Sequence, residues 1–193
     1  MTSQPEDGHL LTDLPPARRG AGTPYRIAVV CLGNICRSPI AEVVLSAKID
    51  AAGLADQVEV VSAGIGSWHV GDPMDRRAAA VLVAHGYDSS RHRAQQFEAD
   101  WLADYDLVLA MDGANFAAIS SLYDSSGAAS GDSPGHPPVV AMFRDFDPGA
   151  GDGDRDIPDP YFGGDEGFDS VLAMVERTSA AIVEVLLRRS NEH

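Results

Sequence analysis

The sequence predicts a three-layer αβα fold, an α/β class in which a four-stranded parallel sheet lies between two layers of helices. Apolar, β-branched runs that are typical of buried strands alternate along the chain with amphipathic stretches of helical period. Such alternation favours a parallel sheet that is covered on both sides. The length of 193 residues and the hydrophobic content of 45% suit one domain with a sizeable core.

Each element is predicted from its own pattern and stop signals. The first strand is an apolar run, and Gly53 and Gly86 are suited to end the first two helices. The Ser-, Gly- and Pro-rich segment 124–138 is expected to be a mobile loop. We expect strands over 27–30, 57–63, 107–111 and 139–143. We expect helices over 39–52, from 72 or 73 to about 85, and over 97–104, 114–123 and 168–189.

Composition limits the domain organisation and the partners. Residues 1–24 are expected to form a flexible tail, followed by a single domain over 25–190. The tail lacks the apolar core of a secretory signal, and no segment approaches the roughly 18 apolar residues of a membrane span. A net charge of −15 disfavours nucleic acid and anionic membranes as partners. Having only Cys31 and Cys36 as cysteines suits a reducing, cytoplasmic compartment, although an unconventional route of export stays open.

The most informative stretch joins the first strand to the first helix. Gly33 and Asn34 tolerate positive φ and allow a sharp loop, and Pro39 suits the first turn of a helix. If this loop curls, its backbone N–H groups point inward and form a nest for an anion. We therefore expect a phosphate-binding loop bracketed by Cys31 and Arg37, with Leu32, Gly33, Asn34, Ile35, Cys36 and Ser38 as its members.

Cys31 is the candidate nucleophile of this loop. A helix N-terminus and a nearby guanidinium favour the thiolate, and Ser38 could donate its hydroxyl proton to the sulfur. Arg37 can bind two phosphate oxygens in a fork while the sulfur attacks phosphorus to form a phosphocysteine. Cys36 has two open roles, either a packing residue or a resolving thiol that captures an oxidised Cys31 as a disulfide.

The leaving oxygen needs a proton, and Asp159 is the best candidate to supply it. The prolines on either side of Asp159 stiffen its loop and would hold the carboxyl in place. The same carboxylate can later deprotonate the attacking water. Asp156 competes for this role. Tyr161 and Phe162 could form an aromatic wall for a flat substrate ring.

No metal or other cofactor is expected. Asp152, Asp154 and Asp156 alternate as they would in a calcium loop. Such a loop needs Gly at its sixth position and Glu at its twelfth, where this chain has Ile157 and Gly163. The six histidines show no metal-ligand spacing.

The stretch Val30–Glu42 resembles the signature of the low-molecular-weight protein tyrosine phosphatases, of a bacterial, actinobacterial type. Further blocks match in order and extend the resemblance over about Arg26 to Leu187, so that it covers all but the two ends. These blocks are Ser62-Ala63-Gly64 with Trp68-His69-Val70-Gly71, His92-Arg93-Ala94-Gln95-Gln96, Ala110-Met111-Asp112, and Asp159-Pro160-Tyr161.

The resemblance implies a four-stranded parallel sheet flanked by helices. It also implies hydrolysis of phosphotyrosine in proteins through a cysteinyl-phosphate intermediate. It assigns the nucleophile to Cys31, phosphate binding to Arg37 and the general acid to Asp159. By the same resemblance, Asn34 holds the loop conformation with help from Ser62 and His92, and Trp68 and Tyr161 flank the substrate ring.

Departures from the family pattern affect the rim and the substrate. Ile65 stands where many members have Thr, and the tail and the 124–138 loop are long. Phe162 replaces a frequent second Tyr, which keeps an aromatic wall but removes a hydroxyl. Related arginine-phosphate phosphatases tend to carry Thr in place of Ile35, so this apolar residue points toward aryl phosphates.

Two other function classes are weighed against a phosphatase. An arsenate reductase on the same fold would need further cysteines to relay a disulfide, and Cys36 is the only other cysteine of this chain. A non-catalytic phosphopeptide-binding module would need a broken catalytic set, whereas Cys31, Arg37 and Asp159 are all present. The sequence therefore predicts a cytoplasmic protein tyrosine phosphatase whose partners are phosphotyrosine-containing proteins.

Overall fold

A parallel sheet forms the centre of the protein in the computed structural model, which describes residues 10–20, 22–125, 139–151 and 153–191. Within these residues, the strands form one four-stranded sheet in the order β2-β1-β3-β4, and every neighbouring pair is parallel. The predicted fold class is therefore confirmed. The strands are β1 (Tyr25–Cys31), β2 (Val58–Gly64), β3 (Leu107–Ala110) and β4 (Val139–Met142).

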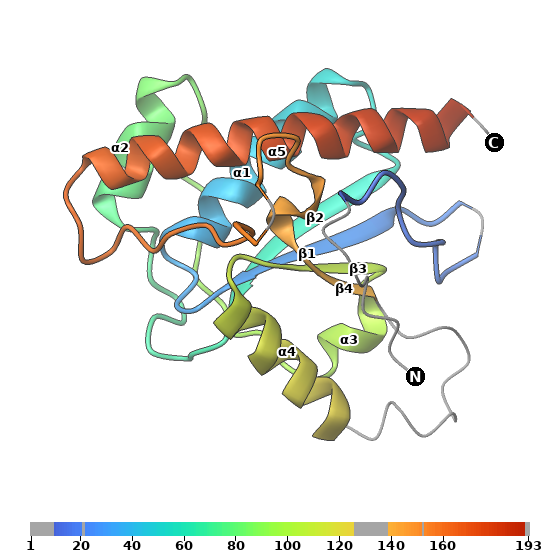
Figure 1. Cartoon of the computed structure of the whole chain (residues 1–193), viewed down its shortest axis with the longest axis horizontal. Helices are drawn as coiled ribbons and strands as arrows, with labels where there is room; N and C mark the ends of the chain where they lie inside the picture. The colour runs from blue at the N-terminus through green and yellow to red at the C-terminus, as the bar shows by residue number, and fades with distance from the viewer. Residues whose placement is uncertain (1–9, 21, 126–138, 152, 192–193) are drawn as a thin grey trace.

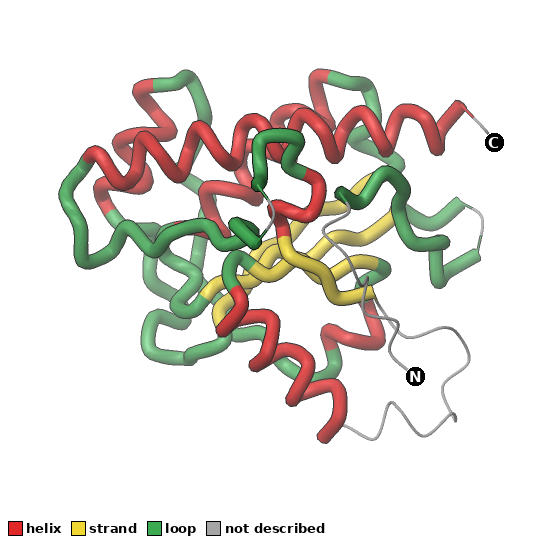
Figure 2. The backbone as a smooth tube through the Cα atoms, viewed as in Figure 1, coloured by secondary structure: helices red, strands yellow, loops and turns green. Residues whose placement is uncertain are grey.

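Helices cover both faces of the sheet, as Figures 1 and 2 show. One buried cluster joins Ile27 and Val29 to the helices of one face, and a second joins Ala28 and Val30 to those of the other. Successive side chains of β1 thus point to opposite layers. The first layer contains α1 (Arg37–Ala51), α2 (Arg76–Ala84) and α5 (Glu166–Asn191), the second contains α3 (Trp101–Asp104) and α4 (Gly113–Ser125), and a 3₁₀ turn, η2 (Phe143–Phe146), follows β4.

The central strand β1 leads directly to the phosphate-binding loop. It pairs on both sides, with Val30 level with Ala63 of β2 and with Ala110 of β3. Because all the pairs are parallel, the carboxyl ends of the strands meet at one edge of the sheet. Cys31 is the last residue of β1 and lies at this edge, where parallel sheets usually bind ligands.

Two helices begin later than the sequence pattern indicates. α2 begins at Arg76 because the side chain of Asp75 accepts the backbone N–H of Arg77 at 2.8 Å and caps the helix. The helix predicted over 97–104 is wrong over its first part, since only 101–104 is helical. The N–H of Phe97 donates instead to the carbonyl of Gly64 at 2.7 Å, so tertiary hydrogen bonding overrides the local pattern.

The described part of the N-terminal segment lies against the domain. The N–H of Leu11 donates to the carbonyl of Asp145 at 2.7 Å, and the carbonyl of Pro15 accepts the hydroxyl of Tyr25 at 3.1 Å. Leu11 and Leu14 also pack against the core. The flexibility predicted for 1–24 and the boundary at residue 25 stay predictions, but residues 10–20 and 22–24 include several points of attachment.

Some predictions fall partly on residues that the structure leaves undescribed. Residues 1–9 of the tail, residues 126–138 of the predicted mobile loop and Asp152 lie outside the described residues. In the described part of the chain, no helix is long and apolar enough to cross a membrane. The same residues contain no group of three or more His, Cys, Asp and Glu side chains that could hold a metal ion.

Candidate active site

The loop after β1 curls around the sulfur of Cys31. Asn34 has a φ of 56°, in the left-handed region that Asn tolerates better than most residues. Its backbone N–H donates to the Sγ of Cys31 at 3.3 Å. The hydroxyl of Ser38 lies 3.0 Å from the same sulfur, as expected from the sequence. Two donors therefore converge on the sulfur, which suits a thiolate as their acceptor.

Gly33 contributes space to this loop instead of the positive φ that the sequence suggested. Its φ is not positive. A Cβ on Gly33 would lie 3.2 Å from the Cδ2 of His69, a contact tight enough to push one of the two residues away. The absence of a side chain thus allows the segment that carries His69 to approach the phosphate-binding loop.

The side chain of Asn34 ties the loop to two other segments. Its amide nitrogen donates to the hydroxyl of Ser38 at 2.9 Å and to the hydroxyl of Ser62 at 2.8 Å. Its amide oxygen accepts the N–H of Gln95 at 2.8 Å, and its backbone carbonyl lies 2.8 Å from the Nε2 of His92. Every polar group of Asn34 thus has a partner, and these partners hold the strained residue in place.

Glu42 of α1 also belongs to this network. The hydroxyl of Ser62 donates to a carboxylate oxygen of Glu42 at 2.5 Å. The same oxygen lies 3.8 Å from the Nδ1 of His92. Ser62 and His92, predicted as loop supports, are therefore both in contact with Asn34, and both lie beside the Glu42 carboxylate.

Arg37 lies over the loop as a buried cation and is only 3% exposed. One guanidinium nitrogen donates to Asp112 at 2.5 Å and to the carbonyl of Ile157 at 3.1 Å. The other nitrogen donates to Asp159 at 2.8 Å. Burial alone would lower the pKa of Arg37, but the charges of Cys31, Asp112 and Asp159 raise it. The guanidinium therefore stays charged, and its fork is oriented by these three acceptors.

Asp159 and Asp156 have different surroundings. Asp159 lines the same cavity as Cys31 and Arg37. One oxygen of Asp156 accepts the N–H of Gly113 at 2.9 Å, at the start of α4. Asp156 is thus held at the N-terminus of α4 and is not among the residues that line this cavity.

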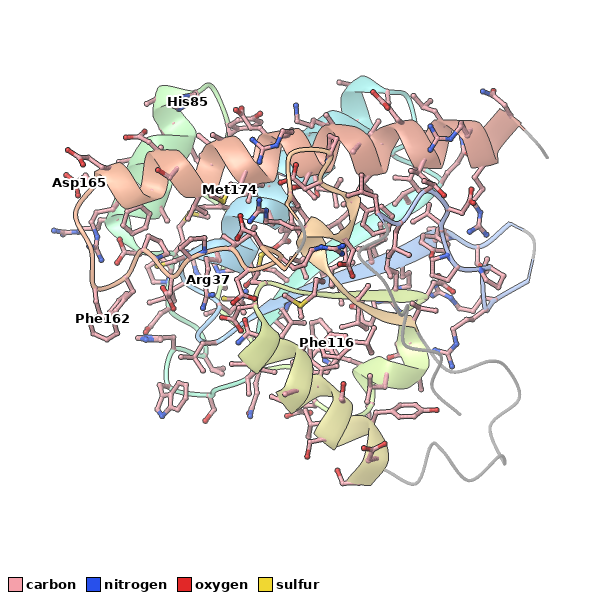
Figure 3. The ribbon with its side chains drawn as sticks, in the orientation of Figure 1. Arg37, His85, Phe116, Phe162, Asp165 and Met174 are labelled. Carbon is pink, nitrogen blue, oxygen red and sulfur yellow. The ribbon has the colours of Figure 1, made fainter. Side chains whose placement is uncertain are left out.

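The cavity that Cys31 lines has a volume of about 150 Å³. Three aromatic side chains are among its lining residues. Trp68 is 71% exposed and Phe162 is 94% exposed, and Phe162 projects outward from the loop before α5 in Figure 3. The residues that line the cavity are Cys31, Leu32, Gly33, Ile35, Cys36, Arg37, Trp68, His69, Asp159, Tyr161 and Phe162.

The two sulfurs of the loop differ in their environment. Cys36 is buried, and no disulfide joins it to Cys31 in the structure. Burial raises the pKa of the Cys36 thiol to about 12, with a further contribution from the charge of Asp75. Cys36 is therefore a neutral thiol at physiological pH.

Comparison with known proteins assigns the chain to a family. Residues 26–192 match the family described as "Low molecular weight phosphotyrosine protein phosphatase". The chain belongs to this family. The low molecular weight protein-tyrosine-phosphatase of Streptomyces coelicolor is 43% identical over 159 residues, which cover 82% of this chain and 92% of that protein. The low molecular weight protein-tyrosine phosphatase A of Mycobacterium tuberculosis is 42% identical over 153 residues, covering 79% and 86% of the two chains.

Solved structures agree with the family assignment. The crystal structure of the protein tyrosine phosphatase from Entamoeba histolytica, with Hepes in its active site, superposes with a TM-score of 0.74. It is 26% identical in sequence, and the match covers 86% of this chain and 99% of that chain. The resemblance predicted from the loop signature is thus confirmed, including its actinobacterial type.

Sequence reasoning missed several residues of this phosphatase site. Asp112 contacts Arg37, Glu42 orients the loop supports, Gln95 binds Asn34, and His69 lines the cavity. All four lie within the stretches that carried the family resemblance, but nothing in their local pattern indicates a role. A signal for Asp112 was available, because it follows a buried strand and so lies at the same sheet edge as Cys31.

Proposed function

We propose that this protein hydrolyses phosphotyrosine in proteins through a cysteinyl-phosphate intermediate. The single observation that carries the proposal is the arrangement around one cavity. The sulfur of Cys31 accepts hydrogen bonds from the N–H of Asn34 and the hydroxyl of Ser38. The Arg37 guanidinium and the Asp159 carboxyl lie 2.8 Å apart and line the same cavity. A nucleophile, an anion-binding fork and a proton donor thus face one space.

Binding begins with an exchange of partners at Arg37. In the free protein, its fork is occupied by Asp112 and Asp159. A phosphate dianion offers the guanidinium two oxygens in the same fork geometry, while the backbone N–H groups of the loop bind the remaining charge. The exchange releases Asp159 beside the leaving-group oxygen.

Two displacement steps then complete the reaction. Once it is released from Arg37, the Asp159 carboxylate takes up a proton from solvent. The Cys31 thiolate attacks phosphorus, the P–O bond to the aryl group breaks, and Asp159 gives this proton to the leaving oxygen. Water next attacks the phosphocysteine and transfers a proton to the Asp159 carboxylate, which restores the thiolate and releases inorganic phosphate. Arg37 binds the equatorial oxygens during both transfers.

The shape of the cavity supports an aryl phosphate as the substrate. Tyr161 and Phe162 have their ring centroids 5.0 Å apart with planes at 89° on one side of the mouth, and Trp68 also lines the mouth. Ile35 is an apolar lining residue that suits a ring better than a guanidinium. The physiological partners proposed are phosphotyrosine-containing proteins in the cytoplasm, which agrees with two free thiols.

Hydrolysis of p-nitrophenyl phosphate in the presence of a chelator tests the proposal. Wild-type protein should release nitrophenolate, and Cys31→Ser should abolish the release because the nucleophile is lost. Asp159→Ala should lower kcat/KM for phenyl phosphate by roughly 10²–10⁴-fold, the usual contribution of a general acid. Asp156→Ala is the matched control and should change little. Full activity of Cys31→Ser would end the proposal, and a large loss in Asp156→Ala alone would move the acid to that residue.

A further inference from the structure

Arg77, on the first turn of α2, links the phosphate-binding loop to the loop that carries Asp159. The Asp75 carboxylate accepts the Nε of Arg77 at 3.1 Å and one of its terminal nitrogens at 3.1 Å, so the guanidinium is held in a two-bond fork. The backbone N–H of Asp75 in turn donates to the carbonyl of Ile35 at 2.8 Å. The Asp75–Arg77 pair is thereby attached to the phosphate-binding loop.

The free edge of the same guanidinium is attached to the acid loop, residues 159–163. Its terminal nitrogens donate to the carbonyl of Tyr161 at 3.0 Å and to the carbonyl of Gly163 at 3.2 Å. The guanidinium carbon lies 4.7 Å from the ring centroid of Phe168 and 5.8 Å from that of Tyr161. A single side chain thus contacts the middle and the end of this short loop and, through Phe168, the start of α5.

We infer that Arg77 is a positioning residue, which holds the acid loop in register with the phosphate-binding loop so that Asp159 stays over the leaving oxygen. The inference rests on the proposed function. In the free protein, Asp159 is held from the side by Arg37 and from its own loop by the N–H of Tyr161, at 3.1 Å. Phosphate binding removes the first of these contacts. The two carbonyl contacts of Arg77 remain and keep the backbone of the acid loop in place.

Arg76 provides a matched control. It precedes Arg77 on the same helix, carries the same charge and is exposed to solvent. The hydrogen bonds found in the described residues do not connect Arg76 to the acid loop. Any effect of net charge or of helix propensity should therefore appear equally in Arg76→Ala and Arg77→Ala.

Leaving-group dependence distinguishes positioning of the acid from a general structural effect. For a poor leaving group such as phenol, protonation by Asp159 is essential, whereas 2,4-dinitrophenol leaves without a proton. Arg77→Ala should lower kcat/KM for phenyl phosphate by roughly tenfold or more and leave 2,4-dinitrophenyl phosphate nearly unchanged. Arg77→Lys, which keeps one donor, should lie between wild type and Arg77→Ala. Equal losses for both substrates, or equal effects in Arg76→Ala and Arg77→Ala, would overturn the inference.

Hydrogen exchange tests the same contact without relying on activity. Amides of residues 159–168 should exchange faster in Arg77→Ala than in wild type or Arg76→Ala, with the rest of the chain unchanged. If wild-type protein failed to hydrolyse any aryl phosphate, the proposed function would fail, while the exchange result would still support or reject the contact. Unchanged exchange in Arg77→Ala would reject it. Should Arg77→Ala fail to fold, Arg77→Lys supplies the same pair of readouts.

Discussion

The two ends of the sheet each bury a charged side chain, but with opposite sign and with different kinds of partner. At the carboxyl end, the cation of Arg37 is surrounded by the carboxylates of Asp112 and Asp159. At the amino end, the carboxylate of Asp106 accepts the backbone N–H groups of Arg18 and Arg26 at 2.7 and 2.8 Å and the guanidinium of Arg19 at 3.1 Å.

The difference lies in whether the partners can be replaced. The side chains of Asp112 and Asp159 are 19% and 37% exposed, so water and phosphate can reach the pairs that they form with Arg37. Asp106 is 1% exposed, and two of its donors belong to the main chain. A buried cation with accessible anionic partners can exchange them for a substrate, whereas a buried anion bound by backbone N–H groups is a permanent part of the fold.

Replacing arginine by lysine at each end should give the largest contrast. Arg37→Lys keeps the charge but loses the fork, so we expect kcat/KM for p-nitrophenyl phosphate to fall by roughly 10²–10³-fold. Arg19→Lys is the matched change at the other end, where one donor contacts Asp106 and a lysine can replace it. It should leave kcat/KM unchanged. A loss of less than tenfold in Arg37→Lys would show that the fork is not what binds the phosphate.

Asp106→Asn should affect stability instead of catalysis. The carboxylate of Asp106 accepts hydrogen bonds from Arg18, Arg19 and Arg26. In asparagine, one carboxylate oxygen is replaced by an NH₂ group, which is itself a donor, so at least one of these N–H groups loses its acceptor. We expect the free energy of unfolding in urea to fall by roughly 1–3 kcal/mol, with kcat/KM unchanged.

Asp104→Asn provides the control for this change, because Asp104 lies on the exposed surface two residues earlier. Its effect should stay within about 0.5 kcal/mol. If Asp106→Asn instead lowered kcat/KM while stability was retained, the two ends would be coupled, and the amino end would not be a purely structural site.

The same comparison explains what the sequence could predict. The grouping of Cys31, Ser38 and Arg37 was predictable because these residues are neighbours in the chain, and Asp159 was selected because it lies between two prolines. The contact between Asp112 and Arg37 joins residues 75 positions apart, and the contact between Arg18 and Asp106 joins residues 88 positions apart. Such pairs depend on strand order, which local patterns do not encode.

Tertiary contacts also determine structure that the local pattern does not indicate. Residues 97–100 have a helix-like pattern, but the hydrogen bond from Phe97 to Gly64 holds this segment against β2. The N-terminal segment has the polar, proline-rich pattern of a tail, and its flexibility stays a prediction, but Leu11 and Leu14 pack against a core cluster that includes residues of β4 and α5. In both cases, a partner distant in sequence determines the local structure.

The smallest effect on kcat/KM is expected at Cys36, the second sulfur at the carboxyl end of the sheet. Burial raises the pKa of Cys36 to about 12, so its thiol is uncharged at neutral pH. Cys36 therefore takes no part in the exchange of anionic partners for phosphate. Cys36→Ser should therefore leave kcat/KM close to that of wild type. Iodoacetate at pH 7 should alkylate Cys31 and spare Cys36, and inorganic phosphate should slow the alkylation, as mass spectrometry can measure. Preferential alkylation of Cys36 would contradict this assignment of the two thiols.

A role for Cys36 should appear only after oxidation. Peroxide converts the Cys31 thiolate to a sulfenic acid with release of hydroxide, and attack by the Cys36 thiol would then form a disulfide and release water. Wild-type protein treated with peroxide should recover activity when a thiol reductant is added. Cys36→Ser should recover less, because its sulfenic acid remains open to further, irreversible oxidation. Equal recovery of the two proteins would show that Cys36 is a packing residue and does not protect Cys31 from irreversible oxidation.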